Sequence, residues 1–252
     1  HRSSLLRSVP VPSTVLGEFL GTLVLILFGN GAVATVLLKD SKGEGSGWMV
    51  ITTGWAIAVL LGVFTASAFG APGELNPAAT IANVILGTRT SSDALAHIVA
   101  QFAGAMSGSV LVWLHFLPHW SRTNDPSLKL ACHCTAPAIR ATGANLLSEV
   151  IGTAALVFVA NAALSLAAQG ATPATNIGPV LVGALVWGIG LSLGGTTGYA
   201  INPARDLGPR LAHALLPIAG KGGSDWSYAW IPVVGPMIGA SLAAYAFATL
   251  SR

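Results

Sequence analysis

Charged residues are scarce in this chain: they make up 8% of its 252 residues, while 53% are hydrophobic and the mean hydropathy is +0.70. Ordinary soluble domains carry roughly 25% charged residues. So little charge excludes a typical soluble domain and predicts a chain that lives in lipid. The 12 basic residues are scattered singly among loops. In spite of a net charge of +3, we therefore expect no nucleic-acid binding.

Cysteine and catalytic motifs are equally scarce. The two cysteines, Cys132 and Cys134, are separated by one residue, which is a poor geometry for pairing with each other. Even with His133 between them, they offer too few ligands for a structural zinc site. The chain contains no HExxH motif, no serine–histidine pairing and no pair of carboxylates expected at one depth. We therefore expect no metal, no cofactor and no enzymatic activity.

Long apolar runs are what the chain does contain. Two shorter apolar pieces begin at Asn76 and Asn202, and their length of about 12 to 15 residues favours re-entrant segments over full spans. Arg2 and Arg7 precede the first long run, as in a signal peptide, but this run exceeds a signal core and we expect it to remain as a span. Six runs reach the length of about 20 residues that a bilayer requires: Val15–Leu38, Trp48–Phe69, Ala94–Leu117, Leu146–Ala168, Ile177–Gly195 and Tyr228–Leu250.

The two halves of the chain repeat each other. Asn-Pro-Ala occurs at Asn76 and again at Asn202, 126 residues later in a chain of 252. The segment GEFLGTLVLILF, with Glu18, is similar to SEVIGTAALVFV, with Glu149, and both precede an Asn-Pro-Ala triplet by more than 50 residues. Each half therefore has three spans and one re-entrant piece. Because three crossings is an odd number, the second half must enter from the opposite side of the membrane, which predicts inverted repeats.

Asn followed by Pro is a favourable helix start. The asparagine oxygen accepts from free N–H groups of the first turn, and proline has no N–H to leave unsatisfied. Asn76 and Asn202 are therefore predicted to cap two half-helices whose N-termini meet near the bilayer centre. With both amide oxygens used as caps, the NH₂ groups remain as donors towards a passing solute. The positive ends of the two half-helices repel cations. This pattern predicts a pore for neutral molecules.

Paired Asn-Pro-Ala triplets in inverted repeats resemble the aquaporin and aquaglyceroporin (major intrinsic protein) family, and the resemblance covers nearly the whole chain. Asp206 directly after Asn-Pro-Ala-Arg, Arg210 four residues later and the pair Pro232-Val233 are most similar to bacterial glycerol facilitators. The resemblance implies an all-α membrane protein with six transmembrane helices and two re-entrant half-helices. It also implies a single channel domain over residues 1–252, with repeats at approximately 13–118 and 144–250.

The resemblance further implies a homotetramer that spans a bacterial inner (plasma) membrane several times, with cytoplasmic termini. The distribution of lysine and arginine among the loops does not itself favour this orientation. Its partners would be the lipid bilayer and small neutral solutes, glycerol and water. We expect passive conduction of these solutes with exclusion of ions and protons.

The family's motifs place the functional residues in two groups. The central constriction matches both triplets: Asn76, Pro77, Ala78, Asn202, Pro203 and Ala204. The selectivity filter matches Trp48, Gly190, Tyr199 and Arg205. A small glycine leaves room for a polyol, whose carbon side slides along aromatic rings while its hydroxyl side accepts hydrogen bonds from the guanidinium. For each filter residue a structural alternative stays open: Trp48 as an interfacial belt residue, Gly190 in helix packing, Tyr199 as an anchor and Arg205 paired with Asp206.

Four acidic residues complete the expected site. An ionisable group inside a span suggests a proton relay, but the family uses Glu18 and Glu149 to accept N–H donors from the re-entrant loops, and Asp206 belongs to the same loop support. Glu74 departs from the family, which commonly has histidine two residues before the first asparagine. An ionised Glu74 would add a negative charge to the cytoplasmic half of the path.

Three other functions remain as alternatives. Glu74 and Tyr199 suggest a channel for undissociated small acids such as lactic acid, for metalloid hydroxides or for hydrogen peroxide. A secondary active transporter is compatible with inverted repeats and broken helices, but it needs a coupling-ion site. An intramembrane enzyme is disfavoured by the missing motifs.

Overall fold

The computed structural model describes residues 12–168 and 177–251, and within these ranges the chain is helical, without a β-strand. Arg2 and Arg7 lie outside the described residues. The helices that account for the six predicted spans are α1 (Pro12–Leu37), α2 (Trp48–Ala68), α4 (Ser91–His115), α7 (Thr142–Ala168), α8 (Gly178–Ser192) and α10 (Ile231–Leu250).

Five of these six helices are apolar and long enough to cross a membrane, and the expected all-α membrane fold is confirmed. The exception in length is α8, with 15 helical residues. It ends at Ser192 instead of the predicted Gly195, because the chain turns at the glycine-containing segment 193–197. Glycine adopts turn conformations at low steric cost, so it ends the helix here.

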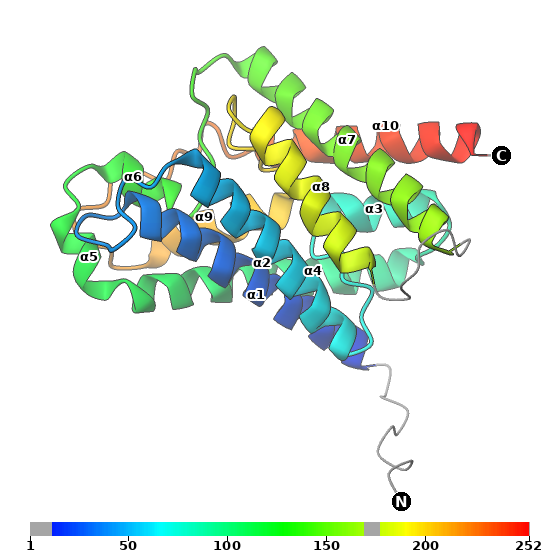
Figure 1. Cartoon of the computed structure of the whole chain (residues 1–252), viewed down its shortest axis with the longest axis horizontal. Coiled ribbons are helices and arrows are strands. Elements are labelled where there is room, and N and C mark those ends of the chain that lie inside the picture. The colour runs from blue at the N-terminus through cyan, green and yellow to red at the C-terminus, as the bar shows by residue number, and fades with distance from the viewer. Residues whose placement is uncertain (1–11, 169–176, 252) are drawn as a thin grey trace, which may run out of the picture.

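The two short pieces are half-helices: α3 (Pro77–Ile85) and α9 (Pro203–Leu215). Each one packs mainly against the other half of the chain, α3 on α10 and α9 on α4. The start of α1 and the end of α10 lie on the same side of the bundle, towards the right of Figure 1. We call this side the inner face and the opposite side the outer face. Along this axis α3 lies towards the inner face and α9 towards the outer face (Figure 1).

Glycines bring the long helices of each half into close contact. In α4, a Cβ at Gly104 would lie 2.3 Å from the Phe19 carbonyl oxygen of α1. In α10, a Cβ at Gly239 would lie 2.3 Å from the Val150 carbonyl oxygen of α7. Both distances are far below a van der Waals contact, so only glycine allows these backbones to approach, as is common in membrane helices. The same close crossing thus occurs at corresponding places in the two halves.

The outer face carries structure that the sequence patterns did not predict. Two short helices, α5 (Leu117–Arg122) and α6 (Pro126–Ala131), follow α4 in the long connection between the halves. Asp125 caps α6 by accepting from Ser127 N at 2.7 Å, and Pro126 occupies the first helical position. The segment after α6 then folds inwards against α9, where Thr135 contacts Asp206. The connection therefore supports the outer half-helix instead of forming a separate unit.

Candidate conduction pathway

Both half-helices begin with an asparagine cap. Asn76 has extended backbone angles, φ −154° and ψ 114°, and its side-chain oxygen accepts from Ala78 N at 2.9 Å. Asn202 has φ −155° and ψ 107°, and its oxygen accepts from Ala204 N at 3.0 Å and Arg205 N at 3.2 Å. Proline follows each cap, where a missing N–H costs nothing. The same local chemistry therefore starts two helices that lie 126 residues apart.

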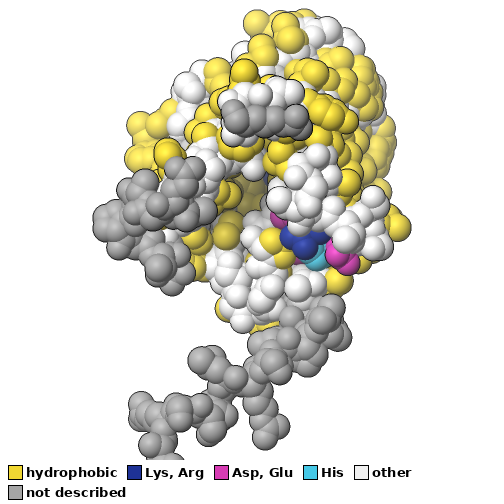
Figure 2. Space-filling model, turned by 90° about the vertical axis from the view of Figure 1, so that its right-hand side faces the viewer, with side chains coloured by type: hydrophobic (Ala, Val, Ile, Leu, Met, Phe, Trp, Pro, Cys, Tyr) yellow, Lys and Arg dark blue, Asp and Glu magenta, His cyan; other side chains and the backbone are white. Residues whose placement is uncertain are grey.

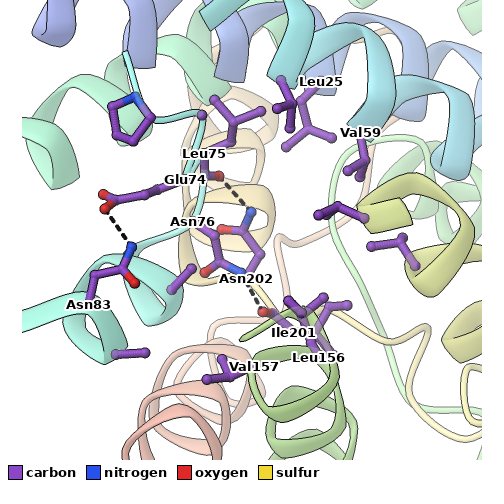
Figure 3. A pocket seen from close by; sticks show the side chains of 18 of the residues that line it. Leu25, Val59, Glu74, Leu75, Asn76, Asn83, Leu156, Val157, Ile201 and Asn202 are labelled. Carbon is purple, nitrogen blue, oxygen red and sulfur yellow. Dashed lines mark hydrogen bonds between the residues drawn. The ribbon is translucent and has the colours of Figure 1, made fainter. Parts of the chain in front are cut away.

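The two caps also hold each other's loops. Asn76 Nδ2 donates to the Ile201 carbonyl oxygen, and Asn202 Nδ2 donates to the Leu75 carbonyl oxygen, both at 2.8 Å. Figure 3 shows these two bonds crossing between the segments. An amide NH₂ group has two hydrogens, so one hydrogen of each group, and not both, remains for a solute. The reciprocal bonds join the N-termini of the half-helices at the centre of the bundle.

A buried glutamate holds the loop before each cap. Glu18 accepts from Glu74 N at 2.9 Å and Leu75 N at 2.8 Å. Glu149 accepts from Ala200 N at 3.0 Å and Ile201 N at 2.8 Å. Both glutamates are fully buried.

These bonds fix an unfavourable backbone. Leu75 has φ 52° and Ile201 has φ 43°, in the left-handed region that side chains such as leucine and isoleucine rarely adopt. Such a conformation persists only where its surroundings determine it. Here the N–H of each strained residue is held by a glutamate and its carbonyl oxygen by the opposite asparagine. The strained backbone conformation therefore points the carbonyl groups of Leu75 and Ile201 towards the place where the two halves meet.

A cavity of about 400 Å³ passes this meeting point. It runs from Thr88 and Arg89, near the inner face, past Asn76 and Asn202 to Arg205. Its wall is mostly apolar, and Figure 3 shows Leu25, Val59, Leu156 and Val157 among the lining side chains. Viewed from the inner face, the molecule has a hollow with hydrophobic side chains in it and a small group of charged side chains beside it (Figure 2). The cavity thus combines an apolar wall with a few polar groups, as a path for a small amphipathic solute requires.

Arg205 and Trp55 form the outer end of this cavity. The guanidinium carbon of Arg205 lies 4.1 Å from the centroid of the Trp55 ring, a cation–π contact. Arg205 is 7% exposed, and its Nη1 has no hydrogen-bond partner among the described residues. This nitrogen is therefore a free donor at the outer end. Tyr199 also lines the cavity, and its hydroxyl lies against Gly190, where a Cβ would be 2.9 Å from it.

Trp48 is placed differently from the expectation. Its side chain is not part of the cavity wall, and the residue is 41% exposed. Its Nε1 donates to the Gly190 carbonyl oxygen at 3.1 Å, and its ring meets that of Tyr199 edge to face at 5.9 Å. The tryptophan that faces Arg205 is Trp55, seven residues further along α2. Seven residues are about two helical turns, so both indoles point to the same side of α2 and only depth separates them.

Asp206 pairs with Arg210 and leaves Arg205 free. Arg210 Nε donates to Asp206 Oδ1 at 2.8 Å, and both side chains are fully buried. Asp206 Oδ2 also accepts from Thr135 N at 2.8 Å and from its hydroxyl at 2.6 Å. The alternative that Asp206 serves as the partner of Arg205 is therefore not what the structure shows. The pair ties the outer half-helix to the connection that follows α6.

Glu74 lies beside the inner part of the cavity, with its side chain 3% exposed. Its carboxylate accepts from Asn83 Nδ2 at 2.7 Å, as Figure 3 shows, and from the Thr80 hydroxyl at 2.8 Å. Arg89 Nε donates to it at 3.2 Å, and His97 Nδ1 lies 3.3 Å away. Arg89 compensates the carboxylate charge. The path therefore does not receive the free negative charge that the sequence suggested.

Glu18, Glu74 and His97 bring ligand-type atoms within 4.8 Å of one another. Both Glu18 oxygens already accept from N–H groups, and both Glu74 oxygens accept from side-chain donors. The Arg89 guanidinium adds a positive charge to the same group. Because a metal ion needs free lone pairs and no cation next to it, these residues do not form a metal site.

Helices long enough to span a bilayer, half-helices that meet head to head and a cavity along their junction define a multi-pass membrane channel. The chain belongs to the major intrinsic protein family, which matches residues 5–247. A probable glycerol uptake facilitator protein of Thermotoga maritima is 53% identical, over 92% of this chain and 97% of that protein. A glycerol uptake facilitator protein of Streptococcus pneumoniae strain R6 is 54% identical, over 92% and 96%. The solved aquaglyceroporin of Plasmodium falciparum has a TM-score of 0.84 at 25% identity and covers 95% of this chain and 96% of its own.

Proposed function

We propose that this chain conducts glycerol and other small neutral solutes, with some water, passively and in both directions, while excluding ions and protons. The observation that carries the proposal is the cavity that runs from Arg89 past both asparagine caps to Arg205. Its apolar wall and its separate polar groups match a molecule with a carbon side and a hydroxyl side. The glycerol facilitators that are about half identical to this chain support the same solute class.

The centre of the path selects against charge. Each half-helix N-terminus carries roughly half a positive charge, and the reciprocal asparagine bonds hold two such ends together. The triplets Asn76-Pro77-Ala78 and Asn202-Pro203-Ala204 form this constriction. A cation or hydronium meets a positive potential there, whereas a hydroxyl oxygen accepts from the free amide hydrogens. Glu18, Glu149 and Asp206 act as scaffold for the constriction, because their oxygens are occupied by donors from the loops.

The outer end acts as the selectivity filter, with one change from the sequence-based set. Trp55 takes the place assigned to Trp48, and Tyr199 and Arg205 complete the wall. Because Gly190 has no side chain, the Tyr199 ring has room to lie against it. Trp48 supports the filter from outside by its contacts with both Gly190 and Tyr199. A polyol passes with its carbon atoms on the aromatic rings and its oxygens on the free nitrogen of Arg205.

The structure gives the other candidate functions less support than glycerol conduction. A path for undissociated acids was suggested by Glu74 and Tyr199; Arg89 compensates the charge of Glu74, and the Tyr199 hydroxyl lies against Gly190. A secondary active transporter needs a coupling-ion site, and the positive centre of the path is unfavourable for a cation. The polar side chains that line the path are amides, guanidinium groups, the hydroxyls of Thr88 and Tyr199 and the occupied carboxylate of Glu74. Neither hydroxyl is paired to a base among the described residues, so we assign no catalytic activity.

We further propose the setting in which the channel works. The repeats at about 13–118 and 144–250 form a single channel domain, because each half-helix packs on the opposite half. Exposed apolar residues along the spanning helices, such as Phe28, Leu95, Ile151 and Leu242, face lipid or other subunits. A homotetramer in a bacterial plasma membrane, each subunit with its own path, fits this surface.

Stopped-flow light scattering on proteoliposomes tests the proposal. Vesicles containing the chain are expected to swell in a glycerol gradient far faster than protein-free vesicles, and equal rates would reject it. Accumulation of glycerol against a gradient would instead indicate a transporter. Two variants test the filter: Trp55→Phe should change the ratio of glycerol to water permeability, since Trp55 faces Arg205, whereas Trp48→Phe, which removes only a contact behind the filter, should change the ratio less. The opposite result would restore Trp48 to the filter.

A further inference from the structure

The inner end of the cavity carries a second guanidinium, that of Arg89, which lies in the connection between α3 and α4. Its side chain is 20% exposed and lines the cavity together with Thr88. Its Nε donates to Glu74, and this is the one hydrogen bond of the Arg89 side chain among the described residues, which leaves Nη1 and Nη2 without a partner there. A long arginine side chain at a pore mouth normally keeps its rotamer freedom, and fixing it costs conformational entropy. Here one of its nitrogens is fixed and the others remain available to a solute.

Glu74 fixes Arg89 and takes no part in solute contact itself. The carboxylate accepts from Thr80 and Asn83 of α3 as well as from Arg89, and only 3% of its side chain is exposed. With its lone pairs in use, it has little capacity to accept from a hydroxyl group. Its negative charge offsets that of Arg89, so the pair adds donors to the path without adding net charge.

Two residues with amide side chains also line the cavity. Asn83 uses its NH₂ group on Glu74, and Asn161 of α7 uses its NH₂ group on the Val157 carbonyl oxygen at 2.8 Å. The side-chain oxygens of both residues have no partner among the described residues, and both residues line the cavity. The cavity wall also includes the apolar side chains of Leu164 and Val182. Donors, acceptors and an apolar wall are therefore combined a second time, at the end opposite to Arg205.

We propose that Arg89, Asn83 and Asn161 form an inner binding station for small neutral polyols. This inference rests on the proposed function and deepens it. The free nitrogens of Arg89 donate to a hydroxyl oxygen, and the two amide oxygens accept from hydroxyl hydrogens. Glu74 is a positioning residue that acts through Arg89. The station replaces part of the water shell of a polyol at the inner end, so it favours polyols over water and leaves the ion barrier at the centre unchanged.

Arg89→Leu in the full chain, reconstituted in liposomes, is the direct test. Glycerol permeability is expected to fall about five- to tenfold with the loss of charge-assisted hydrogen bonds, and water permeability by less than about twofold. Arg122→Leu is the matched control, because Arg122 pairs with Asp40 outside the cavity, with side chains 69% and 45% exposed. It should change neither permeability. An unchanged glycerol-to-water ratio in Arg89→Leu, or an equal fall of both permeabilities, would overturn the proposal.

Two more variants separate a positioning role from a structural one. Glu74→Gln should lower the glycerol-to-water ratio when Arg89 is present and have little further effect in the Arg89→Leu background, because Glu74 acts through Arg89. Equal effects in both backgrounds would contradict this. If Arg89→Leu does not fold, Arg89→Lys applies the same test, since lysine keeps the charge but loses the fork of donors. It should lower the ratio, and an unchanged ratio would count against the station.

These measurements distinguish the proposed function from the inner binding station. A wild-type chain that conducts no glycerol would reject the proposed function. A wild-type chain that conducts glycerol, with a ratio insensitive to Arg89, would reject only the inner station.

Discussion

The half-helices α3 and α9 begin with the same triplet and the same cap, but they are anchored by different ion pairs. In α9 the pair is Asp206 and Arg210, one turn apart on the helix and fully buried. In α3 the carboxylate, Glu74, precedes the helix, and its partner Arg89 follows it, with 20% of the side chain exposed in the cavity. The outer pair is therefore only structural and leaves Arg205 to face the path. The inner pair both holds its half-helix and supplies the guanidinium of the path.

The comparison predicts unequal costs when the two carboxylates are neutralised. Asp206→Asn leaves Arg210 buried without a counter-charge, and breaking a buried pair in this way costs about 3 to 5 kcal/mol. Glu74→Gln should cost less, about 1 to 3 kcal/mol, because Arg89 can turn towards water in the cavity. Thermal unfolding of the detergent-solubilised variants measures which substitution destabilises the protein more. An equal or larger destabilisation by Glu74→Gln would contradict the division of roles.

The close helix crossings should behave alike in the two halves. Gly104→Ala and Gly239→Ala each place a methyl group 2.3 Å from a carbonyl oxygen of the neighbouring helix, and overpacking of this kind costs about 1 to 3 kcal/mol. Gly31→Ala is the control, because no atom lies within 4 Å of a Cβ at that position. Lower melting temperatures for the first two variants, but not for the control, are expected. A large difference between Gly104→Ala and Gly239→Ala would show that the halves are not equivalent in packing.

The smallest expected effect concerns an ion pair in the outer loops. This pair lies outside the path. Burial acts to raise the pKa of Asp225, but hydrogen bonds from Arg140 and Ser227 outweigh it and lower the pKa below its usual value. A lowered pKa stabilises the fold above the unfolded value of about 3.9, and this stability is lost as the pH falls through the folded value. Because 53% of the Arg140 side chain is exposed, we expect less than about 1 kcal/mol.

The melting temperatures of the wild type and of Arg140→Ala are measured at a series of pH values from neutral to acidic. The variant should lose slightly less stability on acidification, since it lacks the bond that depends on ionised Asp225. Identical acid sensitivity in both proteins would show that the pair contributes nothing measurable.

The sequence predicted the parts of the fold that depend on local chemistry. Hydrophobic length located the spans, and the Asn-Pro triplets located the starts of α3 and α9 to within one residue, although α3, with 9 residues, is shorter than expected. The end of α8 was placed three residues too late because an apolar run does not show where glycines turn the chain. The helices α5 and α6 were missed because each has six residues and no periodic pattern of its own.

The site residues were predicted less well where they depend on depth and on distant partners. Both Trp48 and Trp55 lie on α2, and the motif match assigned the filter to Trp48, whereas Trp55 is the tryptophan that reaches Arg205. Glu74 stood out by its position, but its charge is compensated by Arg89, 15 residues later in the chain. Such a contact depends on how α3 turns back, which the sequence pattern does not show. The Asp206–Arg210 pair was not predicted either, although its signal was present in the sequence, because residues four apart face each other on a helix.

The most direct test of the account is a high-resolution experimental map of the protein in glycerol. The account predicts continuous solute density along the path, with an oxygen atom within hydrogen-bonding distance of both Asn76 Nδ2 and Asn202 Nδ2. A map in which the two half-helices lie apart, or in which packed side chains close the path between Arg89 and Arg205, would contradict it.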